Sequence, residues 1–305
     1  MPITVDACAA QHQGDRKEQQ DRLAILPHVH QRGVALAVVA DGMGGHTGGA
    51  LAAEQVVHTA KTSFECFSPT VEMARILLEN SMLEAHLMIK ASRFMNEKDP
   101  HSTAVMLLLQ PGKATWAHCG DSRLYRFRDG EPIFRSVDHS YVEHLIATGR
   151  LTPEEALTHP NRNVLITSLG GKENPRFDFG EARDLTGDDS FVLCSDGLWA
   201  YFDDAEMGRI VAENSARRAS EILVDAARAR AGGGGDNLSL VIIKLNEARP
   251  AVAAPVTARR QCSSACPDRR AAPRRPASAC AGRPWPAAWG NPANRRAAPC
   301  PRRAC

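Results

Sequence analysis

Four aspartates lie in short, glycine-containing segments beside apolar runs of strand length. Asp41, Asp121 and Asp196 follow such runs, and Asp236 precedes one. A strand end holds its side chain rigidly, and neighbouring glycines let a ligand or another backbone segment approach closely. If these strand ends meet at one end of a sheet, the four carboxylates form an oxygen-only pocket of the kind that binds hard divalent cations. The pattern therefore predicts a metal site.

Each aspartate taken alone has a simpler interpretation. Asp41 and Asp196 are followed by glycine, and Asp-Gly is an ordinary turn dipeptide. The glycine run before Asp236 lacks the lysine and the Ser/Thr that complete a phosphate-binding P-loop, so it is expected to be a flexible lead-in. The metal hypothesis thus depends on the four aspartates together.

Composition divides the 305-residue chain into two parts. Residues 248–305 contain twelve arginines, no lysine and one acid, Asp268, which gives them a formal charge of +11. Because the whole chain carries +2, the residues before them carry −9. We expect one folded domain over residues 1–247. The Ala/Pro/Arg/Cys-rich basic tail at 248–305 is expected to be disordered, because it has little apolar surface to bury.

Three origins remain open for this tail. It could be a linker, an arginine-rich arm for nucleic acid or anionic lipid, or an out-of-frame extension without a selected function. Arginine clusters attract phosphate backbones, but aromatic residues other than Trp285 and Trp289 are missing between them. This composition argues against nucleic-acid binding, and the uniform texture favours the out-of-frame origin.

The rest of the sequence is typical of a cytoplasmic protein. The N-terminus turns polar at once, unlike a signal peptide, and no stretch reaches the roughly 18 apolar residues that a membrane span needs. Cys119 and Cys194 lie in apolar runs, where cysteine usually acts as a small core residue.

Apolar periodicity predicts the elements that position the aspartates. Strands are expected at residues 34–40, 103–109, 114–119, 123–128, 133–136, 177–182, 190–193 and 238–245, and helices at 50–63, 70–94, 141–148, from 152 onward, and at 216–229. Strands and helices occur in blocks, which favours layered sheets flanked by helices over a doubly wound parallel sheet. The polar helical segment 138–163 is expected to form a surface flap.

Six segments occur in an order and spacing that point to a known family. They are VVADGMGGHTGG, HSTAVMLLL, HCGDSRLYRFRDG, DHSYVEHLIATGRLTPEEALTHPNRNVLITSLGG, DSFVLCSDGLW and GGDNLSLVII. The chain resembles the metal-dependent serine/threonine protein phosphatases of type 2C (PPM), especially the compact bacterial members, over residues 10–245. This resemblance implies an α+β fold: a four-layer α-β-β-α sandwich with two central antiparallel sheets flanked by helices.

The resemblance also implies a centre of two Mn²⁺ or Mg²⁺ ions. Asp41 matches the carboxylate that bridges them, and Gly42 the residue whose carbonyl binds one of them. Asp196 and Asp236 match the remaining direct ligands. Asp121 matches the residue that, with Asp196, holds a third, looser ion in bacterial members.

Further positions match residues around the metals. Arg16 matches the arginine that grips the substrate phosphate, and Asp21 a second-shell acid that acts through water. Asn237 follows the final ligand. Gln20 stands where the family commonly has an acid, which is expected to weaken water-mediated metal contacts without abolishing the site. Met43 stands where some members carry a histidine that is thought to protonate the leaving group.

Other polar residues in these segments are given structural roles. His46, His139 and His159 are expected to be structural or substrate-facing. The hydroxyls of Ser102 and Thr103 are expected to satisfy backbone groups at the start of a strand.

The implied function is hydrolysis of phosphoserine and phosphothreonine in proteins that are targets of a bacterial Ser/Thr kinase. Two ions lower the pKa of a water, which attacks phosphorus directly, while the ions and an arginine balance the phosphoryl charge. Cys119 and Cys194 then need no catalytic role. Two alternatives stay open: an inactive relative that binds phosphoproteins, and a two-metal phosphodiesterase or nuclease. The acidic body favours substrates with basic residues near the phosphate.

Overall fold

The computed structural model describes residues 3–44, 47–93 and 99–247. The expected tail at 248–305 and His46 therefore lie outside the described residues. The strands are β1 (Ile3–His12), β2 (Arg22–Pro27), β3 (Ala35–Ala40), β4 (Gly42–Met43), β5 (His101–Ser102), β6 (Ala104–Gln110), β7 (Lys113–Cys119), β8 (Arg123–Arg128), β9 (Glu131–Arg135), β10 (Asp178–Ala182), β11 (Asp189–Cys194) and β12 (Leu238–Glu247). The helices are α1 (Thr47–Glu65), α2 (Ala74–Ser92), α3 (Tyr141–Ala147), α4 (Pro153–Ala156), α5 (Asp196–Trp199), α6 (Asp204–Glu213) and α7 (Ala216–Ala231).

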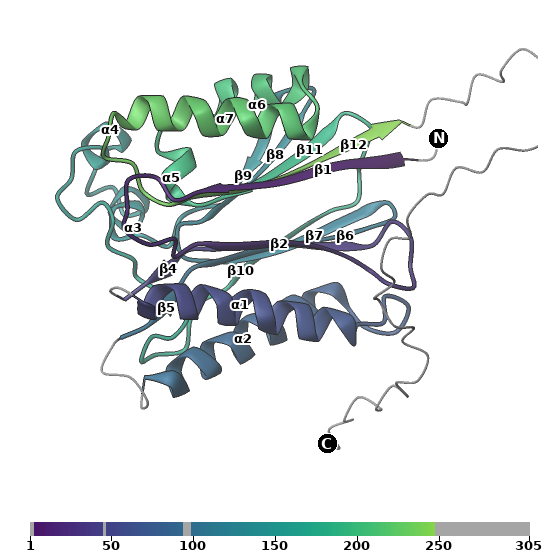
Figure 1. Cartoon of the computed structure of the whole chain (residues 1–305), viewed down its shortest axis with the longest axis horizontal. Coiled ribbons are helices and arrows are strands. Elements are labelled where there is room, and N and C mark those ends of the chain that lie inside the picture. The colour runs from purple at the N-terminus through teal and green to yellow at the C-terminus, as the bar shows by residue number, and fades with distance from the viewer. Residues whose placement is uncertain (1–2, 45–46, 94–98, 248–305) are drawn as a thin grey trace, which may run out of the picture. The chain divides into compact units, whose positions relative to one another are not determined.

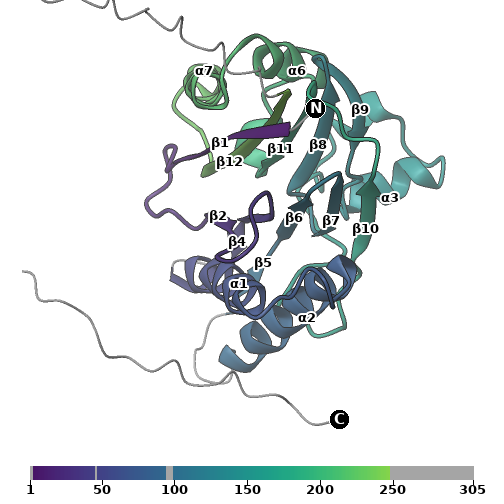
Figure 2. The same ribbon diagram turned by 90° about the vertical axis from the view of Figure 1, so that its right-hand side faces the viewer.

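Two five-stranded sheets lie face to face between two layers of helices (Figures 1 and 2). The strand order is β1-β12-β11-β8-β9 in the first sheet and β10-β7-β6-β3-β2 in the second, and all of these neighbours pair antiparallel. Helices α6 and α7 pack on the outer face of the first sheet, and α1 and α2 on that of the second. The predicted four-layer α-β-β-α sandwich is confirmed.

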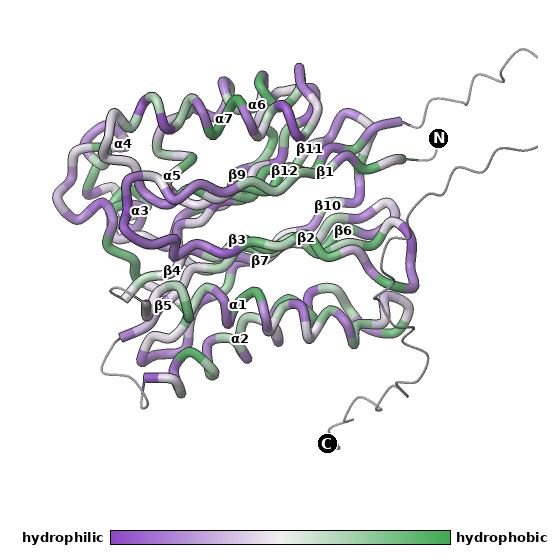
Figure 3. The backbone as a smooth tube through the Cα atoms, in the orientation of Figure 1, coloured by the Kyte–Doolittle hydropathy of each residue, from purple (hydrophilic) through white to green (hydrophobic). Residues whose placement is uncertain are grey.

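Three apolar layers hold this sandwich together, and β3 shows how. Leu36 and Val38 pack against α1 and α2, whereas Ala37 and Val39 pack between the sheets. Side chains of a strand alternate between its faces, so a strand covered on both sides must be apolar at every position. This explains the continuous apolar runs in the sequence, and Figure 3 shows hydrophobic residues along much of the central strands.

The structure adds elements that the periodicity did not predict. The first is β1, an edge strand whose side chains are only exposed or half-buried. An edge strand with one covered face needs little apolar sequence, so its signal is weak. The strand β2 and the helix α6 were also missed.

The flap segment contains a capping box at the start of α4. The hydroxyl of Thr152 accepts a hydrogen bond from the Glu155 N–H, and the Glu155 carboxylate accepts one from the Thr152 N–H. At the start of the segment, Arg123 donates two hydrogen bonds to Asp138, at 2.8 and 2.7 Å. This bidentate pair anchors the segment to β8.

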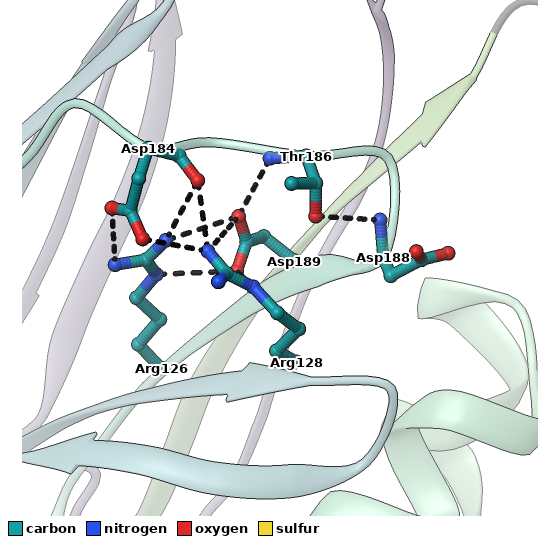
Figure 4. A network of polar contacts seen from close by, with 6 residues as sticks. All are labelled: Arg126, Arg128, Asp184, Thr186, Asp188 and Asp189. Atoms are coloured by element: carbon teal, nitrogen blue, oxygen red, sulfur yellow. Dashed lines mark hydrogen bonds and ion pairs between the residues drawn. The ribbon is translucent and has the colours of Figure 1, made fainter.

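A buried ion-pair network lies where β8 ends and β11 begins (Figure 4). The carboxylate of Asp189 is fully buried, and Arg126 and Arg128 both donate to it. Burial alone would raise the pKa of Asp189, but the two arginines lower it. Asp184 extends the network to the surface. Asp121 and Asp196 adjoin the other ends of β8 and β11. The network therefore has a structural role.

Among the described residues, we find no helix with the length and apolar character that crossing a membrane requires.

Candidate active site

Strand ends from both sheets bring five aspartates together at one edge of the sandwich. In the second sheet, Arg22 pairs with Ala40, so Asp21 and Asp41 are the next residues beyond this pair. In the first sheet, β8 begins, β11 ends and β12 begins at the same edge. The residues at these three ends are Asp121, Asp196 and Asp236. The structure therefore places the four aspartates singled out in the sequence at one edge of the sandwich, and Asp21 joins them.

Burial and mutual charge make ionisation of these carboxylates unfavourable. Burial, and then the charges of Asp21 and Asp196, raise the pKa of Asp41 well above its ordinary value. Burial, and then Asp121 and Asp236, raise the pKa of Asp196 to about 8. Burial is also the main reason why the pKa of Asp21 and that of Asp121 rise to about 6. Carboxylates disfavour each other's ionisation in this way only at short range.

The cluster has the donor set of a hard-cation site. Its ligand atoms are carboxylate oxygens, which suit Mg²⁺ and Mn²⁺. Next to these atoms, Asp21 Oδ1 is buried without a hydrogen-bond partner among the described residues, as expected of an oxygen that faces a metal-bound water. A divalent cation would neutralise the mutual repulsion that raises these pKa values. The residues present therefore fit a divalent metal centre.

The hydroxyls of Ser102 and Thr103 fix the backbone of Asp41. The Asp41 N–H donates to Thr103 Oγ1 at 3.0 Å. The Asp41 carbonyl accepts from the Thr103 N–H at 2.8 Å and from Ser102 Oγ at 3.0 Å. The prediction that both hydroxyls satisfy backbone groups is confirmed, and the groups they satisfy belong to the central aspartate.

Gly42 follows Asp41 in a position that has no room for a side chain. A Cβ atom there would lie 2.0 Å from the carbonyl oxygen of Gly49, in the first turn of α1. Only glycine allows the backbone after Asp41 to approach α1 this closely. The neighbouring Met43 pairs with His101 in the short β4–β5 ladder.

Two serines that sequence analysis missed hold Asp21 under the cluster. Ser195 Oγ donates to Asp21 Oδ2 at 2.8 Å and accepts from the Ser239 N–H at 3.0 Å. The Ser195 N–H donates in turn to the Ser239 carbonyl at 3.0 Å. Ser195 thus joins β12 and the start of α5 to Asp21. Its only sequence signal is its place directly before Asp196.

Replacing Ser195 by alanine is expected to lower the free energy of unfolding by about 1–3 kcal/mol. The change leaves the buried Asp21 Oδ2 and the Ser239 N–H without their shared partner, and the loss follows from their desolvation. Urea unfolding at pH 7 in EDTA measures this. Ser63→Ala, on α1, is the control, and equal stability of the two variants would contradict the role of Ser195.

Asn237 folds the loop between β1 and β2 onto the cluster. Its Oδ1 accepts from the Gln20 N–H at 2.7 Å. Its Nδ2 donates to the carbonyls of Gln13 and Glu18, at 2.8 and 3.0 Å. Asn237 and Gln20, which match residues around the metals in the family, therefore lie together, and their contacts shape the loop that carries Arg16.

Arg16 lies at the exposed rim of the cluster. Its Nη2 is 2.5 Å from Asp236 Oδ2, and 63% of its side chain is exposed. The hydrogen bond with Asp236 raises the pKa of Arg16. Asp15, which sequence analysis missed, pins the same loop: its N–H donates to the Gly235 carbonyl at 2.9 Å, and its Oδ2 accepts from the Gly235 N–H at 2.8 Å.

Trp199 positions the segment that carries Asp121. Its indole N–H donates to the Asp121 carbonyl at 3.0 Å. The guanidinium of Arg123 lies 3.6 Å from the centre of the Trp199 ring, a cation–π contact that joins α5 to the anchor of the flap.

Other residues considered from the sequence lie outside the cluster. Burial raises the pKa of the Cys119 thiol to about 12 and also raises that of the Cys194 thiol. Both therefore stay protonated, as expected for core cysteines without a nucleophilic role. His139 stacks on His118, and His159 lies near Tyr141 in the flap.

Comparison with known proteins identifies the family. A family model described as protein phosphatase 2C matches residues 8–229. The chain belongs to the protein phosphatase 2C family. The type 2C resemblance expected from the six segments is confirmed, and so is the class of enzyme, a protein serine/threonine phosphatase.

Bacterial protein phosphatases align over about 70% of the chain. Protein phosphatase PhpP of Streptococcus pneumoniae is 32% identical over 228 residues, which cover 72% of this chain and 89% of that protein. Serine/threonine protein phosphatase PstP of Mycobacterium tuberculosis is 31% identical over 216 residues, covering 69% and 40%.

Solved structures of phosphatase 2C proteins share the fold. A bacterial serine phosphatase superposes with a TM-score of 0.73 at 28% identity, covering 81% of this chain and 100% of that one. The catalytic domain of PstP in complex with two manganese ions gives a TM-score of 0.67 at 26% identity, covering 81% and 100%. The similarity to a manganese complex supports the use of divalent metal by this fold.

Proposed function

We propose that this phosphatase 2C protein hydrolyses phosphoserine and phosphothreonine in proteins by direct attack of a metal-activated water. The observation that carries the proposal is the convergence of five aspartates whose burial and proximity raise the pKa of several members. Such a cluster concentrates negative charge that divalent cations balance.

The proposed centre holds two Mn²⁺ or Mg²⁺ ions. Asp41, the Gly42 carbonyl, Asp196 and Asp236 are the proposed ligands, and Asp121 with Asp196 would hold a third ion. Ions held there would lower the pKa of a water enough for it to attack phosphorus at neutral pH. Cys119 and Cys194 are buried and protonated, so neither thiol supplies a nucleophile. Water is therefore the proposed nucleophile.

Residues around this centre are proposed to orient the ligands and the substrate. Asp21, a fully buried member of the cluster, is held by Ser195. Asn237 and Gln20 hold the loop that presents Arg16. Arg16 offers a planar fork of donors for phosphoryl oxygens at a solvent-accessible position.

The proposed substrates are phosphoproteins produced by a Ser/Thr kinase that this enzyme opposes. The −9 charge of residues 1–247 favours peptides with basic residues near the phosphate. A cytoplasmic location stays a prediction from the sequence.

Phosphate release from a phosphothreonine peptide in EDTA, Mg²⁺ or Mn²⁺ tests the proposed reaction. We expect release only with metal, and no cleavage of a phosphodiester such as bis(p-nitrophenyl) phosphate at a comparable rate. Peptide binding without release at saturating Mn²⁺ would instead favour the inactive, phosphoprotein-binding alternative. Preferential phosphodiester cleavage would favour the nuclease-like alternative.

Replacing Arg16 by lysine is expected to lower kcat/KM for the phosphopeptide by about tenfold to a hundredfold, because lysine keeps the charge but loses the bidentate fork. Steady-state kinetics in Mn²⁺ measures this. Arg217→Lys, at an exposed position on α7, is the control. Unchanged kcat/KM in Arg16→Lys would remove Arg16 from the phosphate-binding role.

A further inference from the structure

A second group of metal-ligating side chains lies apart from the five aspartates. His118 is on β7, Asp178 is on the neighbouring strand β10, and His139 is the second residue of the flap segment 138–163. One ligand atom from each lies within 4.8 Å of the others. The two histidines are 4% and 3% exposed. Burying two imidazoles beside a carboxylate costs free energy unless their polar atoms have partners.

His118 has an unused lone pair. Its Nε2 lies 2.9 Å from the carbonyl oxygen of Val137. Because a carbonyl only accepts, Nε2 carries the proton and Nδ1 is left with a lone pair. Nδ1 is buried without a hydrogen-bond partner among the described residues. Metal-binding histidines commonly donate their second nitrogen to a backbone carbonyl in this way.

His139 presents a second nitrogen to the same space. Its Nε2 lies 3.2 Å from Asp178 Oδ2 but, like His118 Nδ1, is buried without a well-directed hydrogen bond. Burial, and then His118, lower the pKa of His139, so the ring is neutral at neutral pH. Its Nδ1 accepts from the Gly120 N–H at 3.3 Å, so coordination through Nε2 requires the ring proton to move to Nδ1 and this long contact to break.

Asp178 supplies the charge. Burial alone would raise its pKa, but Arg176 and His139 lower it, so the group is a carboxylate. Asp178 and His118 also line a pocket of about 360 Å³ whose walls include Trp116 and Phe134. This pocket offers an entry path and room for a further, non-protein ligand.

We propose that His118 Nδ1, His139 Nε2 and the Asp178 carboxylate form a zinc site with its fourth position open to the pocket. Two imidazoles and one carboxylate are a donor set that zinc accepts, whereas the carboxylate cluster suits Mg²⁺ or Mn²⁺. The ion would join β7, β10 and the first residue of the flap after Asp138. It would thus hold the N-terminal end of the flap segment against the second sheet.

A simpler explanation accounts for part of the same geometry. The two rings stack with centroids 4.7 Å apart, and a polar contact between a neutral His139 and Asp178 needs no metal. That explanation leaves His118 Nδ1 buried without a partner. The two explanations differ in whether a tetrahedral ion binds.

Cobalt(II) distinguishes them, because tetrahedral Co²⁺ absorbs visible light far more strongly than octahedral Co²⁺ in a carboxylate site. We expect the full chain to bind a single tetrahedral Co²⁺ that Zn²⁺ displaces. The visible band should vanish in His118→Gln and Asp178→Asn. It should persist in Asp41→Asn, which perturbs the aspartate cluster, and in the exposed flap control His144→Gln.

Circular dichroism without metal identifies any variant that fails to fold. Asp178 is half-exposed, so Asp178→Asn is less apt to disturb folding than His118→Gln. Absence of the band in the wild-type chain would overturn the proposal. So would a band that survives in a folded Asp178→Asn protein, or one that disappears in Asp41→Asn. Thiolate-to-cobalt charge transfer in the near ultraviolet would assign the ion to cysteines and would also overturn it.

Discussion

Asp41→Asn is expected to reduce kcat for phosphate release in saturating Mn²⁺ by at least about a thousandfold, which corresponds to about 4 kcal/mol of lost transition-state stabilisation. Asparagine keeps the size of the side chain and the backbone hydrogen bonds to Thr103. It removes a carboxylate oxygen and its negative charge from a proposed metal ligand, the residue whose ionisation four other aspartates disfavour.

The stability of this variant separates a catalytic effect from a folding defect. Without metal, Asp41→Asn relieves like-charge repulsion, so it should be at least as stable as the wild type in EDTA. Asp225→Asn, at an exposed position on α7, is the matched control for activity. A folded Asp41→Asn protein with near-normal turnover would remove Asp41 from the metal centre.

The interior strands were predictable because burial on both faces leaves an unbroken apolar signal. The expected strand at 34–40 and the observed β3 differ by one residue. The strand β1 was not predicted, since an exposed edge strand needs no such run. Its ladder to β12 forms between residues more than 200 positions apart, and no local pattern records such pairing.

Asp41, Asp121, Asp196 and Asp236 could be singled out for the same reason, because each stands beside an apolar run, whereas Asp21 was named only from the family resemblance. Antiparallel pairing then places the end of β11 and the start of β12 at one edge, which the order of the segments already allows. The supporting contacts were not predictable. Ser195 reaches Asp21 across 174 positions, and Gly235 reaches Asp15 across 220. No local sequence pattern indicates which distant residue a loop serine or aspartate will contact.

The protein in EDTA is expected to lose stability as the pH rises from about 5 to about 8. The carboxyls of Asp21, Asp121 and Asp196 have pKa values of about 6, 6 and 8 in the folded chain, above their ordinary value of 3.8. The folded state therefore binds more protons than the unfolded state within this window. The free energy of unfolding falls with pH wherever that holds.

Saturating Mn²⁺ should reverse this trend, because cations bind the ionised carboxylates and compete with protons. The stabilisation by Mn²⁺ should thus grow steadily between pH 5 and pH 8. Urea unfolding at each pH, with EDTA or with Mn²⁺, measures both slopes. Asp121→Asn should make the EDTA slope shallower, whereas Asp225→Asn should leave it unchanged. If the stability in EDTA is flat or rises over this range, the aspartates do not repel one another as the structure requires. The charge repulsion from which the metal centre is proposed would then be absent.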